Sequence, residues 1–268
     1  MRKMPTKLRG EAIQEQFKVR ASNGEEFEPT RAIFPIFKHD ADGSFRLLGT
    51  GFFITVHGIF VSAKHVFTDV IDEDGKATGP LSIIQFGENN TFYHRPVASC
   101  AVHGEADVAV GVCANMKHKV TGEPLANKVL TLSLTYPQIG ETVFTYAYPG
   151  TEVLQKEKQE IRIAPRFYDG AVVDYFPKGR DRTMLPFPCY QTSIYLHGGA
   201  SGGPVFSENG RVIGVNSTGY EGDHDISFIS RIQDIYDLEL HDVVFLDDKE
   251  PRRVSIRELV PIRHIAVG

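Results

Sequence analysis

The sequences Gly49-Thr-Gly-Phe-Phe-Ile-Thr55 and Ile59-Phe-Val-Ser62 have the pattern of two short β-strands, with His57 and Gly58 at a turn between them. Aromatic and β-branched side chains favour the pleated, half-buried surface of a strand. Glycine adopts backbone conformations that tight turns require. This stretch therefore predicts a β-hairpin.

Short apolar runs separated by turn residues continue along most of the chain, and no stretch has the pattern of a long amphipathic helix. Such spacing is typical of antiparallel barrels and sandwiches. The first set of runs is Ala32–Phe37, Gly51–Val56, Ile59–Ser62, Leu81–Phe86 and Val108–Val112. The second set is Val129–Leu134, Glu141–Ala147, Glu160–Ala164, Ala171–Tyr175, Tyr190–Ile194, Gly203–Phe206 and Arg211–Asn216.

The two sets of runs predict two β-rich units of similar size joined by a polar linker. The predicted divisions are an N-terminal extension at 1–29, a first unit at 30–114, a linker at 115–128, a second unit at 129–232 and a C-terminal tail at 233–268. The tail is charged and has a weak helix-capping signal, so we expect a short appendage there.

Composition excludes several classes of protein. The chain has 268 residues, of which 41% are hydrophobic and 24% are charged, so it can form a real core. A formal net charge of −5 offers no basic surface for DNA or RNA as the main partner. No run approaches the roughly 18 apolar residues of a membrane-spanning helix, and the basic N-terminus lacks the apolar part of a secretory signal. Because its three cysteines are widely spaced, we expect no disulfide framework and a cytoplasmic location.

A glycine-rich stretch, Gly198-Gly-Ala-Ser-Gly-Gly-Pro204, makes Ser201 a candidate nucleophile. Glycine lets a substrate carbonyl approach the main chain closely, and serine becomes nucleophilic beside a base. The alternative is a glycine-rich turn in which the serine is incidental. The nucleophile elbow of α/β-hydrolases also fits formally, but it requires a helix directly after the serine. Here two β-runs around Asn209-Gly210 follow instead and predict a hairpin.

Candidate partners for this serine lie upstream. His65 follows the second strand of the first hairpin, and Asp107 lies in the apolar run Ala106-Asp-Val-Ala-Val110. Serine catalysis needs a base and an acid that orients this base. Three acids lie nearer to His65 in a turn-rich loop, where solvated carboxylates are usual: Asp69, Asp72 and Asp74. We therefore predict that Asp107 is the acid.

These three segments, in the order histidine, aspartate, serine, resemble the motifs of trypsin-like serine proteases of the chymotrypsin fold. The segment Gln191–Ser201 is similar to that of the bacterial HtrA or Deg branch, and the resemblance covers about residues 45 to 232. No PDZ domain is expected after it. The resemblance implies an all-β fold of two six-stranded antiparallel β-barrels, one in each β-rich unit.

The same resemblance implies a serine endopeptidase that forms an acyl-enzyme intermediate. Ser201 would attack the scissile carbonyl, His65 would act as general base and then general acid, and Asp107 would orient His65. The backbone N–H groups of Gly199 and Ser201 would form the oxyanion hole. The implied substrate is a protein or peptide.

The segment Ser217, Thr218 and Gly219 would bind the substrate by strand addition, with Ser217 also supporting the triad acid. By resemblance, Tyr195 lies at the base of the primary specificity pocket with Leu196 beside it. Neither residue is acidic, so a substrate Lys or Arg would have no buried counter-charge. We therefore predict cleavage after uncharged, small or medium apolar residues.

Regulation is expected to differ from that of secreted relatives, which place an acid directly before the nucleophile to bind a newly cut N-terminus. This position is Ala200, so activation by that route is closed. A regulatory partner or a homo-oligomer acting through loops such as Phe176–Thr183 is the expected alternative.

Two further interpretations stay open. The chain could be a protease-fold binding module with an idle triad, or it could also hydrolyse small esters. His94, Cys100 and His103 suggest a metal cluster, but their spacing matches no common zinc pattern, and we interpret them as structural. No metal and no cofactor is predicted.

Overall fold

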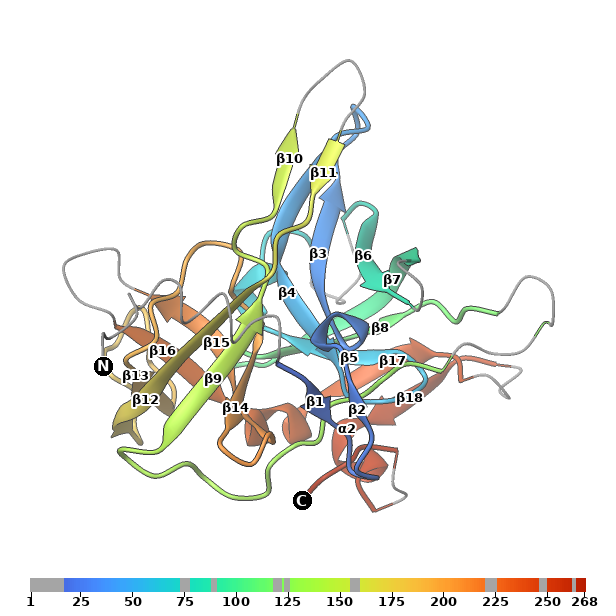
Figure 1. Cartoon of the computed structure of the whole chain (residues 1–268). Coiled ribbons are helices and arrows are strands. Elements are labelled where there is room, and N and C mark those ends of the chain that lie inside the picture. The colour runs from blue at the N-terminus through green and yellow to red at the C-terminus, as the bar shows by residue number, and fades with distance from the viewer. Residues whose placement is uncertain are drawn as a thin grey trace, which may run out of the picture.

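The computed structural model describes residues 17–72, 78–87, 91–117, 122, 126–154, 160–219, 226–245, 250–261 and 264–268. These residues form two closed six-stranded barrels, which confirms the predicted all-β fold. Figure 1 shows the strands of the first barrel in blue to green and those of the second in yellow-green to orange. The basic N-terminal stretch at 1–16 and the acid Asp74 lie outside the described residues.

The first barrel has the strand order β3-β4-β5-β8-β7-β6. Its strands are β3 (Ile33–His39), β4 (Phe45–Phe53), β5 (Ile59–Ser62), β6 (Leu81–Phe86), β7 (Phe92–Val102) and β8 (Ala109–Cys113). The predicted hairpin is β4 and β5, which pair Phe52 with Val61, and Gly58 has a φ of +96° in the turn. Aromatic rings fill the barrel, and those of Phe34 and Phe60 meet edge to face at 5.6 Å.

The second barrel has the strand order β12-β13-β16-β15-β14-β9. Its strands are β9 (Thr142–Ala147), β12 (Arg166–Phe176), β13 (Cys189–Thr192), β14 (Pro204–Ser207), β15 (Val212–Gly219) and β16 (Ser227–Arg231). The turn at Asn209-Gly210 joins β14 to β15, with Gly210 at a φ of +76° and a backbone hydrogen bond of 2.9 Å from Ser207 to Arg211. This second predicted hairpin is confirmed as well.

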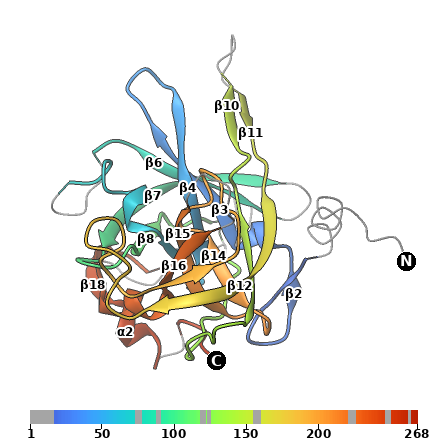
Figure 2. The ribbon, with the colours of Figure 1, turned by 90° about the vertical axis from the view of Figure 1, so that its left-hand side faces the viewer.

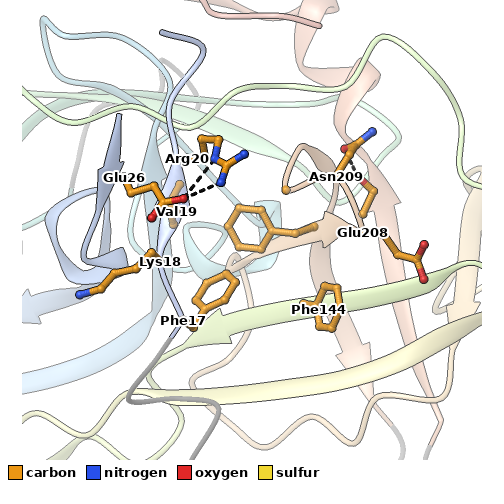
Figure 3. Close-up of a pocket in the computed structure, with 11 residues that line it drawn as sticks. Phe17, Lys18, Val19, Arg20, Glu26, Phe144, Glu208 and Asn209 are labelled. Carbon is orange, nitrogen blue, oxygen red and sulfur yellow. Dashed lines mark hydrogen bonds and ion pairs between the residues drawn. The ribbon is translucent and has the colours of Figure 1, made fainter. Parts of the chain in front are cut away.

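Two small hairpins flank the barrels. Both views show the β10 (Glu152–Leu154) and β11 (Glu160–Arg162) hairpin projecting beside β3 and β4 (Figures 1 and 2). The other hairpin, β1 (Val19–Arg20) and β2 (Glu26–Phe27), follows Phe17, whose ring lies 4.8 Å from that of Phe167 on the second barrel. Phe17 and Phe144 line a cavity of about 450 Å³ beside this hairpin (Figure 3). Phe17 therefore anchors the N-terminal segment to the second barrel.

The C-terminal tail packs on both barrels rather than extending from them. It comprises the 3-10 helix η3 (Ile232–Asp237), β17 (Glu239–Val243), β18 (Arg252–Ser255) and the short helix α2 (Ile256–Leu259). β17 lies against β7 and β8 of the first barrel, and α2 lies against η3, which follows β16 of the second. Val267 forms a parallel bridge with Leu132 of the interbarrel segment. The tail therefore joins the two barrels.

Within the described part of the chain, no helix has the combined length and hydropathy that a membrane span requires.

We predict that Leu240→Ala, in the fully buried centre of β17, lowers the free energy of unfolding by about 2–5 kcal/mol, because it leaves a cavity between tail and barrel. Leu134→Ala is the matched control, since Leu134 is 57% exposed. Urea unfolding of both variants measures the difference. Equal, small effects would mean that the tail contributes little to the folded core.

Candidate active site

His65 lies on a single 3-10 turn, η2 (Lys64–Val66), directly after β5. Its backbone N–H donates to Asp107 Oδ1 at 2.9 Å, and its ring Nδ1 lies 2.9 Å from Asp107 Oδ2. Two contacts from one residue fix both the main chain and the ring relative to the carboxylate. The imidazole side chain is still 49% exposed, so its other nitrogen can reach a substrate.

Asp107 lies just before β8 and is buried. Its Oδ2 also accepts a hydrogen bond of 2.5 Å from the hydroxyl of Ser217 on β15, so the two barrels share this carboxylate. Burial by itself raises the pKa of Asp107, but the hydrogen bonds and charge of His65, together with the Ser217 hydrogen bond, outweigh it and hold this pKa below its ordinary value. The carboxylate is therefore ionised at neutral pH.

Ser201 lies in the loop between β13 and β14, directly after a tight turn. Ala200 N–H donates to the His197 carbonyl at 3.1 Å, and Gly199 has a φ of +90° at the third position of this turn. Such a turn is of type II, where glycine is favoured because φ is positive. In the described part of the chain, the N–H groups of Gly199 and Ser201 donate to no other residue. Both are available to an incoming oxygen atom.

The hydroxyl of Ser201 points to the carbonyl oxygen of Ser217, 3.3 Å away. Among the described residues, no hydrogen bond joins this hydroxyl to His65. In substrate-free enzymes such a bond is often long and tightens only when the substrate binds.

Thr50 on β4 holds this loop against the first barrel. Its N–H donates to the Ser201 carbonyl at 2.8 Å, and its hydroxyl donates to the Gly199 carbonyl at 2.8 Å. The same hydroxyl accepts from the N–H of Tyr148, and the Thr50 carbonyl accepts from the hydroxyl of Ser62. The role of Thr50 was not predicted from the sequence, although its flanking glycines, Gly49 and Gly51, were a signal that another backbone approaches closely.

Gly202 completes this contact between the loop and β4. It has a φ of +84°, and a Cβ atom there would lie 2.1 Å from the Ser62 hydroxyl oxygen and 2.2 Å from the Thr50 carbonyl oxygen. Only glycine fits this position. The glycine cluster around Ser201 therefore has a physical reason beyond flexibility.

A cavity of about 450 Å³ opens beside His65 between the two barrels. The first barrel contributes Lys64, His65, Thr68, Glu105 and Asp107 to its lining, and the second contributes Thr183, Met184, Pro186, Phe187, Ser217 and Thr218. Met184 and Phe187, which the sequence analysis did not single out, give it an apolar wall. Their loop follows β12, and nothing in its sequence indicated that it reaches the first barrel.

Leu196, one of the two predicted specificity residues, lies next to the segment that is predicted to bind the substrate. A Cβ atom on Gly219 would lie 3.4 Å from the Leu196 carbonyl oxygen and 3.6 Å from the Leu196 Cβ. The ring of Tyr195 packs edge to face on His197 at 4.5 Å. The space between Gly219 and Leu196 is therefore narrow.

The suggested cluster of His94, Cys100 and His103 is not brought together around one point. His103 Nδ1 accepts from the backbone N–H groups of Glu105 and Ala106, and Cys100 is buried. Among the described residues, no group of three or more His, Cys, Asp or Glu could hold a metal ion. All three cysteines are free and buried, as expected without a disulfide framework.

Comparison with known proteins places this geometry in a family. The family model for the trypsin-like peptidase domain matches residues 49–215. The active form of the Rv3671c protease from M. tuberculosis aligns with 16% identity over 77% of this chain and 78% of that one, at a TM-score of 0.52. An inactive form of the same protease with a serine-to-alanine substitution aligns with 16% identity over 77% of this chain and 83% of that one, at a TM-score of 0.51. The HtrA-type protease AlgW with a tripeptide aligns with 16% identity over 76% of this chain and 57% of that one, at a TM-score of 0.49. No curated protein matches the sequence.

We predict that Ser217→Ala raises the pKa of Asp107, because it removes a hydrogen bond to the ionised carboxylate. A lowered pKa contributes stability above the ordinary aspartate value of about 4, and this contribution disappears as the pH falls through the folded-state pKa. The stability advantage of wild type over Ser217→Ala at pH 7 should therefore shrink toward pH 3.

Urea unfolding across this pH range measures the effect. Ser99→Ala is the control, because the Ser99 hydroxyl donates to a backbone carbonyl and not to a carboxylate. An advantage of the same size at every pH would contradict the prediction.

Proposed function

The chain belongs to the trypsin-like peptidase family, and on this basis we propose that it is a serine endopeptidase with His65, Asp107 and Ser201 as its catalytic triad. The observation that carries the proposal is the hydrogen-bonded chain from His65 through Asp107 to Ser217. It lies next to a serine loop with two N–H groups that donate to no other residue in the described part of the chain. A protein or peptide is the expected substrate.

In the proposed mechanism, the Ser201 hydroxyl turns from the Ser217 carbonyl toward His65 when the substrate binds. His65 takes the hydroxyl proton on Nε2 while Ser201 attacks the scissile carbonyl. The contact of Asp107 with His65 Nδ1 keeps the proton on that nitrogen, so Nε2 is free to act as base. His65 then donates the proton to the leaving amine, and water hydrolyses the acyl-enzyme by the same route.

The N–H groups of Gly199 and Ser201 are the proposed oxyanion hole. Donors aimed at the developing oxyanion contribute about 3 kcal/mol each, provided that they are positioned beforehand. The hydrogen bonds of Thr50 to the carbonyls of Gly199 and Ser201 support this positioning. Because the loop is already ordered, no free energy is spent on ordering it when the transition state forms.

The segment from Ser217 to Gly219 is the proposed binding strand for the substrate. On one side, Thr218 pairs with Phe228 and Gly219 pairs with Ser227 of β16. On the other side, the backbone hydrogen bonds to the serine loop end at Asn216, and Ser217 and Thr218 line the cavity beside His65. A peptide that adds as a strand at this free edge would pass Ser201 with its main chain in register.

The three unpaired cysteines are the basis of the proposed cytoplasmic location. Burial raises the pKa of Cys113 to about 12 and that of Cys189 to about 11, so both stay protonated. A reducing compartment suits three unpaired cysteines. A regulatory partner or homo-oligomer stays a prediction.

The proposal is tested by cleavage of a denatured protein. We expect wild type to cleave it, and we expect Ser201→Ala and His65→Ala each to lower kcat/KM by at least about 10³-fold. Ser99→Ala should cleave at the wild-type rate, because Ser99 lies on β7 outside the site. A folded wild type without activity would favour the binding module with an idle triad, for which the Ser201 hydroxyl bond to Ser217 is the supporting observation.

We also predict that Gly219→Ala narrows the specificity for the residue before the cleaved bond. The added methyl would contact Leu196 and fill the space for larger side chains. We expect kcat/KM for a Leu substrate to fall by about 10-fold relative to an Ala substrate, as for one or two methylenes in an apolar pocket. Peptides that differ only at this residue measure the ratio. Dominant cleavage after Lys or Arg in wild type would contradict the predicted preference.

A further inference from the structure

Two histidines and a serine meet on one wall of the first barrel, away from the triad. They lie on three neighbouring strands, with His39 at the end of β3, Ser82 on β6 and His94 on β7. Ser82 pairs with Phe37 on one side and with Pro96 on the other. His39 and His94 are each two residues from these partners. Because side chains alternate between the faces of a strand, all three lie on the same face.

The polar atoms of these three side chains converge on one point. The Nε2 atoms of His39 and His94 are 3.2 Å apart, and the Ser82 hydroxyl oxygen lies 2.6 Å from the first and 2.7 Å from the second. Strand pairing alone does not demand this, because imidazole rings on neighbouring strands can point away from each other. Both rings instead turn the same nitrogen inward.

This separation suits two ligands of one metal ion. Zinc binds histidine nitrogen at about 2.0–2.1 Å with tetrahedral geometry, so two such nitrogens lie about 3.3 Å apart. Imidazole is a preferred ligand of zinc and of neighbouring transition metals, but not of calcium or magnesium. We propose that His39 and His94 form a two-histidine site for a zinc-class dication, with water completing its coordination.

The surroundings of the two imidazole rings restrict their motion, which favours metal binding. The Phe45 ring packs 4.3 Å from that of His39 and 6.2 Å from that of His94. Ser82 is only 2% exposed, so its hydroxyl is fixed in the barrel wall, where it contacts both Nε2 atoms. Metal binding would replace these hydrogen bonds with bonds from the two nitrogens to the ion, and any proton on either Nε2 atom would move to Nδ1 or to solvent. Rings held in place by packing lose little freedom when the metal binds. His94 is exposed, so an ion can enter from solvent.

A bound ion would connect β3 to β7 across β6. β3 and β6 are neighbours in the closed barrel although β4 and β5 separate them in the sequence, so the ion would add a link across strands that already pair. Binding to the folded chain alone raises the free energy of unfolding with the metal concentration. The site involves neither the triad nor its cavity, so its test is independent of protease activity.

Titration with ZnCl₂ alone, followed by calorimetry, tests the proposal on the full chain. We expect wild type to bind one more Zn²⁺ than His94→Ala does. Where the number of ions is equal, we expect the most tightly bound Zn²⁺ to have at least 10-fold higher affinity for wild type than for His94→Ala. His241→Ala is the matched control, since it removes another exposed histidine, on β17, and should bind as wild type does. His39→Ala should reproduce the loss. Circular dichroism shows whether each variant is folded.

A second readout separates this site from incidental binding at other histidines. Zn²⁺ should shift the ring nitrogen resonances of His39 and His94 in histidine-selective NMR at the same metal concentration. Equal zinc affinity of folded His94→Ala and wild type would overturn the proposal, and so would a zinc-bound wild type in which these two resonances do not move. In either case the cluster would be a hydrogen-bonded pair only.

Discussion

The site depends on the hydrogen bonds of one buried residue, Thr50. Its main chain and hydroxyl together contact the carbonyls of Ser201 and Gly199, the N–H of Tyr148 and the hydroxyl of Ser62. These partners lie on the serine loop, after β9 and on β5, so a single residue connects both barrels to the nucleophile loop. In a buried position each polar atom needs a partner, so loss of any of these contacts is costly.

The rest of the site follows from this junction. His65 and Asp107 come from the first barrel, whereas Ser201 and Ser217 come from the second. The Ser217 bond to Asp107 crosses between the barrels just as the Thr50 bonds do. The tail strengthens the same junction from another side, where Val267 bridges to Leu132 and β17 lies on the first barrel. A rigid pair of barrels is the condition for a preorganised triad.

Sequence patterns predicted the features whose residues are contiguous in the chain. Both hairpins, β4–β5 and β14–β15, were readable because their strands and turns are contiguous, and Asp107 was chosen from its apolar flanks. The role of Thr50 could not be predicted, since its partners range from Ser62, 12 residues away, to Ser201 on the serine loop, and only the closed barrels bring them together. The same holds for His39, Ser82 and His94, because β3 and β6 are neighbours in the barrel although β4 and β5 lie between them in the sequence. The docking of the tail depends on buried faces that its charged sequence concealed.

The most direct test of this account asks whether Ser201 is activated. A fluorophosphonate probe reacts with a serine only when a base and an oxyanion hole assist it. We predict that purified wild type is labelled once per chain, and that folded Ser201→Ala and His65→Ala are not. An unlabelled, folded wild type would contradict the account, and so would His65→Ala labelled at the wild-type rate.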